Sequence, residues 1–491
     1  MPLDENTPVL VGAGAVMQRE DDPARALEAV ALMEAAARNA ARDAGTEELL
    51  AQVSCIRVTN GIWDYPDPAR ILADRLGAAD ARSELIEVGI LQTTVLAEAA
   101  ARIAAGEDSV VLVVGGEAKY RSLRAAITGT TPPATEQPAG TAPDRFVEPA
   151  REIMHPLELE FGLGMPVNQY AMMESAFRSA HGESLAENRR RIGELYSDMS
   201  RVAAGNEAAW ARETFSAEEI SEPSPRNRML AFPYTKRHNS QWNVDQAACL
   251  ILTSVGRARA LGVPEDRFVF PQVVADSNHM ASLVERGELH RCHGFHLAGQ
   301  AALGHAGLAI EDVDRLELYS CFPIAVRAQI EELGVPEGRP VTQCGGMAFA
   351  GGPLNNFVFQ AMVRMVEVLR GHPGEVGLVS AVSGHLTKQG VSLWSTQAPA
   401  QPFAHLDVAD AVRAVVPMHE VASGFQGRVR IVANTVQYAG EDAVAAIFVC
   451  DLPDGRRTLA SSSDAEILRR AVTEELCGTW AEIGPDGFRP E

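Results

Sequence analysis

The stretch GILQTTVLAEAAARIAAGEDSVVLVVGG, residues 89–116, contains a helix pattern followed by a strand pattern. Its apolar positions recur four residues apart, at Leu91, Val95, Ala99 and Ile103. This spacing predicts an amphipathic helix that Gly106 ends. The continuous apolar run over residues 109–114 then predicts a buried strand, closed by two glycines.

The same order of features returns in GGPLNNFVFQAMVRMVEVLRGHPGEVGLVSAVSG, residues 351–384. The apolar positions are again four apart, at Phe357, Ala361, Met365 and Leu369. Gly371 ends the predicted helix, and residues 376–382 predict a buried strand closed by Gly384. A Gly–helix–Gly–strand module in both halves indicates an internally duplicated α/β fold with largely parallel sheets.

A long polar segment separates the two modules. Residues 129–143 are rich in Thr, Pro and Gly, which predicts a flexible loop, and residues 185–210 predict a long helix. An insertion of this size, about residues 118–245, is longer than an ordinary connection and predicts a lid or loop domain.

The end of the chain has a different character. Residues 429–438, 444–452 and 456–460 predict short strands, and Ser463 is expected to cap a helix over 464–476. Residues 404–491 therefore predict a small, separate, β-rich domain.

Composition excludes several classes of protein. The 491 residues are 46% hydrophobic and 22% charged, with a net charge of −22, so the chain is globular and poorly suited to binding nucleic acid. No apolar run approaches a membrane span, and the first residues lack the features of a secretory signal. The 7 cysteines include no CxxC pair, which predicts reduced thiols and a cytoplasmic location.

Several short runs resemble the thiolase superfamily, in the branch near sterol-carrier-protein-linked thiolases. They are Ala104-Ala105-Gly106-Glu107, Phe232-Pro233-Tyr234-Thr235-Lys236, Val244-Asp245-Gln246-Ala247-Ala248, Tyr319-Ser320-Cys321-Phe322-Pro323 and Leu386-Thr387-Lys388.

The resemblance implies two βαβαβ-type halves in a five-layer αβαβα core, and it implies acyl-CoA substrates. The expected boundaries are residues 1–275 and 276–403, with 404–491 similar to the OB-like extra domain of type 1 thiolase-like proteins.

The family's reaction uses a Cys nucleophile at a helix start, a His that activates it, a second Cys as acid/base and an oxyanion hole. In this chain the corresponding positions are Gly89, Gly352, Val382 and Tyr319. All four groups are therefore replaced, although the surrounding scaffold persists.

Three residues are candidate replacements. Cys321 lies at an expected strand end, and the alternative is a buried hydrophobe. Cys344 lies beside two glycines before the second helix, where a basic neighbour would be needed to activate it. His385 is the best candidate base, because imidazole titrates near neutral pH. Lys388 is interpreted as a surface charge.

Other residues are candidates for substrate binding. The densest basic cluster is either a solvated loop face or a site for the phosphates of coenzyme A, and it consists of Arg226, Arg228, Lys236 and Arg237. Asn355 and Asn356 are interpreted chiefly as helix caps, with contact to a thioester carbonyl as the alternative, and Gly384 precedes His385.

The run His290-Arg291-Cys292-His293 resembles a metal-ligand motif. It lacks a carboxylate or a further His at fixed spacing, so it is interpreted as a surface loop. No metal and no separate cofactor is expected, because coenzyme A would be part of the substrate.

Two functions remain open at this stage. The first is a divergent acyl-CoA acyltransferase, or another enzyme of acyl-CoA thioesters, with non-standard catalytic residues. The second is a non-catalytic subunit that binds acyl-CoA, or a protein partner through its C-terminal domain. We expect binding of acyl-CoA without thiolase-like turnover, and the absence of such binding would leave the partner-binding function.

Overall fold

The computed structural model describes residues 3–491. The first half forms a sheet in the order β1-β8-β4-β2-β3-β5. Its strands are β1 (Pro8–Gln18), β2 (Cys55–Thr59), β3 (Arg82–Ile86), β4 (Val110–Ala118), β5 (Arg145–Val147) and β8 (Asp245–Ser254). Strand β8 runs antiparallel to β1 and β4, whereas β4, β2, β3 and β5 run parallel. The expected largely parallel sheet is therefore mixed, because β8 returns from the lid in the opposite direction.

The second sheet has the order β10-β11-β12-β9-β13. Its strands are β9 (Phe270–Ser277), β10 (Arg315–Glu317), β11 (Val376–Ser383), β12 (Lys388–Ser395) and β13 (Ala404–Asp407). Strands β10 and β11 are parallel, and β12 is antiparallel to both β11 and β9. The sheet thus takes strands from both sides of the expected boundaries at 275 and 403.

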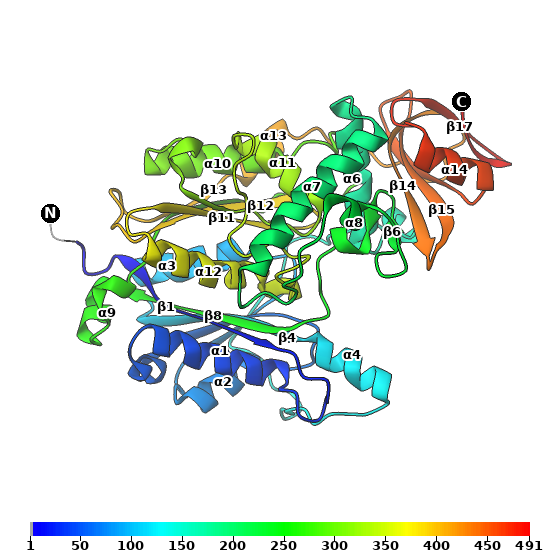
Figure 1. The fold of residues 1–491 in the computed structure, drawn as a ribbon. Helices are drawn as coiled ribbons and strands as arrows, with labels where there is room; N and C mark the ends of the chain where they lie inside the picture. Colours follow the sequence, from blue (N-terminus) through cyan, green and yellow to red (C-terminus); the bar gives the residue numbers. More distant parts are fainter. Residues whose placement is uncertain (1–2) are drawn as a thin grey trace.

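Helices complete five layers (Figure 1). They are α1 (Ala29–Asp43), α2 (Pro68–Leu76), α3 (Gln92–Ala104), α9 (Val255–Ala260), α10 (His293–Ala306), α11 (Pro323–Leu333), α12 (Phe357–Gly371) and α13 (Ala409–Val415). Helices α3 and α12 contact strands of both sheets, while α1 packs on the first sheet and α10 on the second. The αβαβα order that the resemblance implied is confirmed.

The two repeated modules lie at the centre of this stack. Helix α3 and strand β4 follow the predicted positions closely, and so do α12 and β11. The residues predicted to form their apolar faces, such as Val95 and Met365, are buried. The central helices are apolar over much of their surface because a sheet covers each side.

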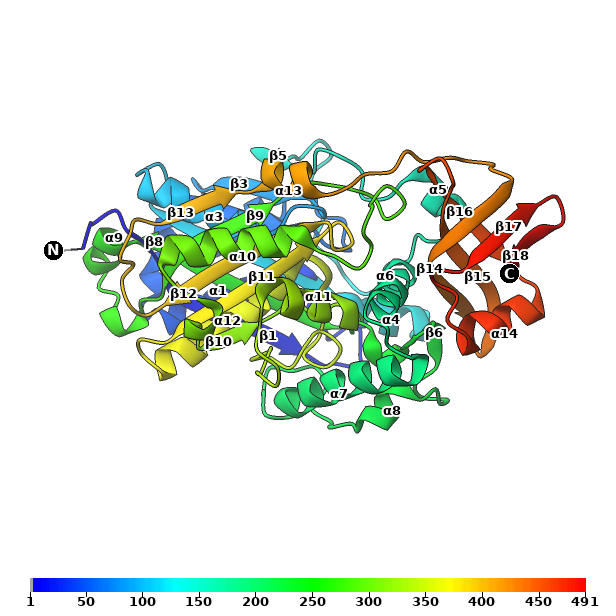
Figure 2. The same cartoon turned by 90° about the horizontal axis from the view of Figure 1, so that it is seen from above.

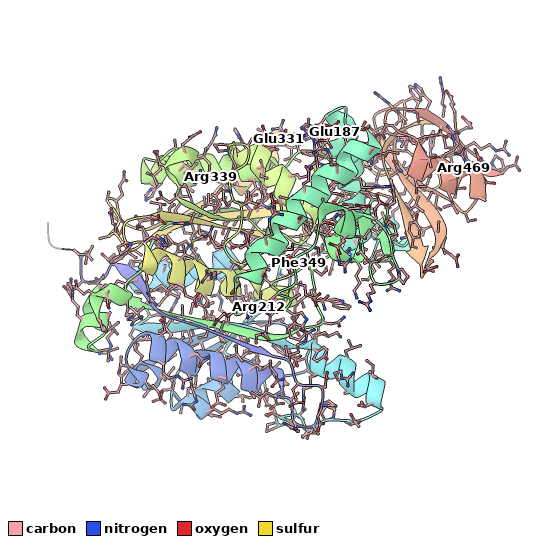
Figure 3. The ribbon with its side chains drawn as sticks, viewed as in Figure 1. Glu187, Arg212, Glu331, Arg339, Phe349 and Arg469 are labelled. Atoms are coloured by element: carbon pink, nitrogen blue, oxygen red, sulfur yellow. The ribbon has the colours of Figure 1, made fainter. Side chains whose placement is uncertain are left out.

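The lid contains several short elements between β4 and β8. They are α4 (Lys119–Thr128), α5 (Pro156–Glu160), α6 (Pro166–Ala180), α7 (Leu185–Ala204), α8 (Ala217–Ser221), β6 (Met229–Ala231) and β7 (Tyr234–Thr235). The chain also has five short 3-10 helices in the described residues, of which η2 lies in the lid and η5 precedes α12. They are η1 (Glu47–Gln52), η2 (Lys236–His238), η3 (Glu265–Arg267), η4 (Ile310–Asp312) and η5 (Leu354–Asn356). Helix α7 is the predicted long helix, and Figure 3 places Phe349 of the second half near its C-terminal end. No helix within residues 3–491 is long and apolar enough to span a membrane.

The C-terminal region forms the sheet β16-β15-β14-β17-β18 (Figure 2). Its elements are β14 (Gly427–Ala439), β15 (Asp442–Asp451), β16 (Arg457–Ser462), α14 (Ala465–Thr473), β17 (Trp480–Gly484) and β18 (Gly487–Pro490). Lid strand β6 pairs with β14, so this sheet is shared with the lid rather than self-contained. Asp464, not Ser463, caps α14, because its carboxylate accepts from two backbone amides of the first turn. The similarity to an OB fold stays a prediction.

Candidate functional site

The start of the first central helix is closed by the lid loop. Gly89 has a φ of +108°, and a Cβ atom added there would lie 3.0 Å from Pro149 Cγ and 3.7 Å from Ile153 Cδ1. A side chain at this position would therefore meet both strain and occupied space. The loop fills the space that a nucleophile would need.

Lys388 reinforces this closure from the other half of the molecule. Its side chain is 3% exposed, and its ammonium donates a 2.8 Å hydrogen bond to the carbonyl of Gly89. Burial lowers the pKa of this amine. The interpretation of Lys388 as a surface charge is wrong, because strand β12 brings it beneath the first helix start.

The start of the second central helix is less constrained. A Cβ atom added at Gly352 would face Ser240 Cβ at 3.0 Å and Met347 Cε at 3.3 Å, and Gly352 does not have a positive φ. Ser240 belongs to the loop after η2, and its hydroxyl donates to the Cys321 carbonyl at 3.0 Å. The lid segment between η2 and β8 thus touches both Gly352 and Cys321.

The two asparagines before α12 do not cap it. Asn356 occupies the N-cap position without a side-chain hydrogen bond to the helix, and both its amide atoms are buried without a partner. Asn355 accepts from Gln92 at 3.2 Å, at the start of α3. The capping interpretation is therefore wrong: these amides face the other half of the molecule and have unused hydrogen-bonding capacity.

Tyr170 of lid helix α6 brings two candidate residues together. Its hydroxyl lies near the Cys321 thiol, and its ring meets that of His385 edge to face, with 6.1 Å between centroids. Phe322 stacks on the same tyrosine at 4.4 Å. Sequence reasoning missed Tyr170, because nothing in the sequence of α6 marks it as a neighbour of Cys321.

Burial makes both partners of Tyr170 electrically neutral. It raises the pKa of the Cys321 thiol to about 12 and, with help from the charge of Arg286, lowers the pKa of His385 to about 4. A neutral imidazole can accept a proton, whereas a thiol of this kind is a poor nucleophile. The cluster can position a ligand and exchange a proton, but it does not present a thiolate.

His385 sits in a backbone segment that L-residues rarely adopt. Gly384, His385 and Leu386 have φ values of +59°, +51° and +72°. Arg286 holds the segment by donating to the His385 carbonyl at 3.0 Å, and Gln389 donates to the Leu386 carbonyl at 2.7 Å. Such conformations persist only where neighbouring contacts enforce them, and they concentrate at functional sites.

Cys344 belongs to a different cluster. Its thiol donates to the Glu317 carboxylate at 3.2 Å, and that carboxylate also accepts from the backbone amides of Gln343 and Cys344. Burial and the neighbouring Glu317 charge raise the pKa of the thiol well above its ordinary value. No basic group appears among these contacts. Cys344 therefore helps to attach its loop to Glu317 at the end of β10.

The lid cations lie on the surface around one hairpin. Arg226, Arg228 and Lys236 are exposed, and none has a carboxylate within ion-pair distance in the described part of the chain. The amide of Lys236 donates to the Arg228 carbonyl at 2.9 Å, which fixes their spacing. Unpaired cations are notable in a chain with a charge of −22.

A buried carboxyl group at the end of β4 was also missed. Glu117 is 2% exposed, accepts from the Ile62 amide at 2.9 Å, and leaves its second oxygen without a partner. Burial raises its pKa to about 7. Glu117 ends a central strand in the first half, much as His385 follows one in the second.

The His290–His293 run does not form a metal site. Cys292 is buried, Arg291 pairs with Glu332 at 2.7 Å, and His293 bonds to Glu288 at 2.7 Å. Residues 3–491 contain no group of three or more potential ligands that could hold a metal. The run begins helix α10, so its interpretation as a surface loop is wrong for Cys292 and His293.

Structural comparison identifies close relatives of this architecture, although no family model and no curated protein sequence matches the chain. The crystal structure of a monomeric SCP2-thiolase-like protein type 1 from Mycobacterium smegmatis superposes with a TM-score of 0.84 at 27% identity. That match covers 100% of this chain and 99% of the other.

Two more distant structures cover 80% of the chain. The Ltp2–ChsH2(DUF35) aldolase matches with a TM-score of 0.61 at 20% identity, over 99% of that chain. Human mitochondrial 3-ketoacyl-CoA thiolase matches with a TM-score of 0.58 at 16% identity, over 100% of that chain. At these identities the last two establish the fold alone, which is the fold of the thiolase superfamily.

Proposed function

Because the chain has a thiolase-superfamily fold like that of the type 1 protein, we propose that it binds acyl-CoA thioesters without forming an acyl-enzyme. The fold is shared with a 3-ketoacyl-CoA thiolase, which supports a thioester ligand. The filled space before Gly89 and the raised thiol pKa values argue against covalent transfer.

The position of the lid cations carries the proposal. Arg228 and Lys236 have no acidic partner in the described residues, so they are free to receive phosphates. From Lys236 the chain runs through η2 to Ser240, which contacts Cys321. In the proposed arrangement the phosphates lie on the hairpin and the thioester lies toward Ser240 and Cys321.

Calorimetry with coenzyme A and acetyl-CoA tests binding. We expect binding by the wild type, weakened about tenfold by Arg228→Gln or Lys236→Gln, since one charged hydrogen bond contributes about 1–2 kcal/mol. Arg190→Gln is the matched control, because Arg190 is an exposed lid cation already bonded to Glu194. Absence of any heat of binding with the wild type would contradict the proposal.

Loss of acetoacetyl-CoA absorbance in the presence of coenzyme A tests turnover. We expect no thiolysis at thiolase-like rates, because removal of a cooperating catalytic set leaves only binding and positioning. Robust thiolysis that Cys321→Ala or Cys344→Ala abolishes would instead identify a relocated nucleophile.

A second candidate function is binding of a protein partner through residues 404–491. Trp480 in this region is 38% exposed, and the Arg428 guanidinium lies 4.5 Å from its ring centroid. Exposed Trp and Arg are enriched at protein interfaces. Calorimetry without any heat of coenzyme A binding would favour this candidate.

A further inference from the structure

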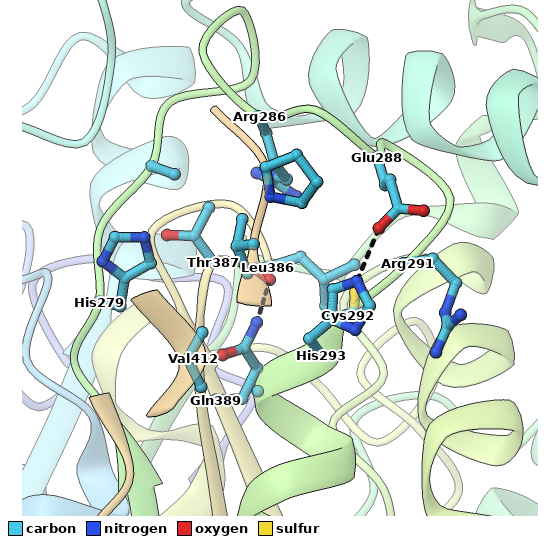
Figure 4. Close-up of a pocket in the computed structure, with 14 residues that line it drawn as sticks. His279, Arg286, Glu288, Arg291, Cys292, His293, Leu386, Thr387, Gln389 and Val412 are labelled. Atoms are coloured by element: carbon cyan, nitrogen blue, oxygen red, sulfur yellow. Dashed lines mark hydrogen bonds and ion pairs between the residues drawn. The ribbon is translucent and has the colours of Figure 1, made fainter. Parts of the chain in front are cut away.

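A small cavity lies between the start of helix α10, the segment that follows His385, and the linker helix α13 (Figure 4). Arg286, His279, Gly294 and Thr387 are among the residues that line it, and its volume is about 20 Å³. This volume suits one water-sized particle. The cavity is therefore far too small for an acyl-CoA molecule, and it is a different site from the one proposed above.

Arg286 is a buried cation without a counter-charge. Its side chain is 5% exposed, and no carboxylate lies within ion-pair distance of it in residues 3–491. Its guanidinium donates to the His385 carbonyl at 3.0 Å and contacts the Met173 sulfur at 3.2 Å, while Nε has no partner. Arginine does not lose its proton in proteins, so an uncompensated charge remains buried here.

The carboxylates near the cavity are already engaged. Glu288 bonds to His293 at 2.7 Å, and Glu332 bonds to Arg291 at 2.7 Å. Glu285 accepts from the Ser282 hydroxyl at 2.7 Å and also pairs with Arg151. None of them neutralises Arg286.

A second buried carboxyl and a second cation complete the surroundings of Arg286. Glu158 accepts from the Val284 amide at 2.8 Å and does not reach the guanidinium. Arg457 donates to the backbone carbonyls of Arg286 and Gly287, and its own charge is paired with Asp451.

The remaining lining groups are mixed in character. Glu288 is a carboxylate, and it is paired with His293. At the start of helix α10 the amide of Cys292 donates to the Glu332 carboxylate at 2.8 Å, and the side-chain oxygen of Gln389 packs against Gly294. His279 has a buried Nε2 without a partner, and burial together with nearby arginines lowers its pKa.

We propose that this cavity binds a small anion of halide size beside Arg286 and His279. The anion would neutralise the guanidinium that holds the left-handed segment at His385. It would also connect α10 with the linker residues Val412 and Pro417, which line the opposite side. The ligand class follows from one unpaired buried cation, a buried ring nitrogen of His279 without a partner and a cavity of single-particle size.

Bromide provides a direct test, since it replaces chloride and scatters anomalously. Crystals of the full chain grown in sodium bromide are expected to show an anomalous peak in the cavity. In solution, replacing gluconate by chloride at constant ionic strength is expected to raise Tm. Formate serves as the second arm: a rise with formate instead of chloride would identify a carboxylate as the source of the anionic group.

Variants sharpen the test. Arg286→Met is expected to lose both the bromide peak and the chloride-dependent shift in Tm. Arg178→Met is the matched control, because Arg178 is equally buried but has its own carboxylate, Glu475. Should Arg286→Met fail to fold, the wild-type measurements decide alone. A cavity that holds water in bromide, with a Tm indifferent to chloride and formate, would overturn the proposal.

Discussion

The two central helices start in the same way in the sequence, yet their surroundings differ. At Gly89 the lid loop and Lys388 occupy the space before the helix. At Gly352 the nearest side chains are Ser240 and Met347, and the backbone has no positive φ. The comparison teaches that both the backbone conformation and the packing favour glycine at position 89, whereas at position 352 packing alone limits a side chain.

The strand ends of the two halves differ in a complementary way. Glu117 at the end of β4 has its pKa raised to about 7, and His385 after β11 has its pKa lowered to about 4. Burial shifts both groups toward the uncharged form, so that His385 is neutral at pH 7 and Glu117 is protonated below about pH 7. Burial therefore disfavours a charge at both strand ends.

Gly89→Ala and Gly352→Ala test the difference between the helix starts directly. We expect Gly89→Ala to lower the free energy of unfolding by about 2–5 kcal/mol, because it combines a left-handed backbone with overpacking against Pro149. Gly352→Ala should cost about 1 kcal/mol, since only a close contact with Ser240 must relax. Urea unfolding measures both. Equal costs would show that the two starts are equally filled.

Glu117 predicts a loss of stability toward alkaline pH. Its pKa is about 7 in the folded chain and 4.5 ordinarily, so the folded state binds the proton more tightly. The stabilisation is complete below pH 4.5 and is lost as pH rises through 7. Between pH 5 and 8 the loss is about 2–3 kcal/mol. In urea unfolding, Glu117→Gln should remove this pH dependence of the free energy of unfolding. An unchanged pH dependence would contradict the raised pKa of Glu117.

His385 predicts a loss of stability toward acid pH, which is the opposite of the trend expected from Glu117. Its pKa is about 4 in the folded chain and 6.5 ordinarily, so the unfolded chain binds the proton more tightly. Its contribution is complete above pH 6.5 and is lost as pH falls toward 4. The loss between pH 7.5 and 5 is at most about 2 kcal/mol, because the ring keeps some exposure. His385→Gln should reduce the change in the free energy of unfolding between pH 7.5 and 5, measured by urea unfolding. The change between pH 5 and 8 that Glu117 causes should remain.

The sequence was informative where a pattern is local. The four-residue spacing of Leu91 to Ile103 and of Phe357 to Leu369 predicted both central helices, because helix faces are encoded by near neighbours. The short motifs around Gly89 and Gly352 likewise carry the prediction that the family's catalytic groups are replaced there. These inferences need no knowledge of the distant chain.

The surroundings of the site could not be predicted in this way. Lys388 and Gly89 are 299 residues apart in the chain, and Tyr170 approaches Cys321 only through the packing of the lid. Arg286 lies in an irregular segment without a motif, so its unpaired charge becomes visible only when its neighbours are known. Contacts between separate halves depend on tertiary packing, which residue periodicity does not encode.

The smallest expected effect is on cysteine reactivity, which tests whether a nucleophile lies near the start of the second central helix at Gly352. Cys321 lies beside it through Ser240, and burial raises the pKa of this thiol to about 12 against an ordinary 9.0. At a given pH this means about a thousandfold less thiolate, in addition to the steric protection of a side chain that is 7% exposed. Cys344 is protected in the same way by burial and by Glu317.

We therefore expect iodoacetamide at pH 8 to leave the native protein unmodified by mass spectrometry. All 7 cysteines should react once the chain is unfolded in urea, which is the internal control. Adding acetyl-CoA should not change the native result, because ligand binding does not lower either thiol pKa in the proposed arrangement. Fast labelling of native protein that disappears in Cys321→Ala but persists in Cys344→Ala would contradict this expectation. It would show that a reactive thiolate lies near the start of the second central helix. The two halves would then differ in the position of a nucleophile and not in its absence.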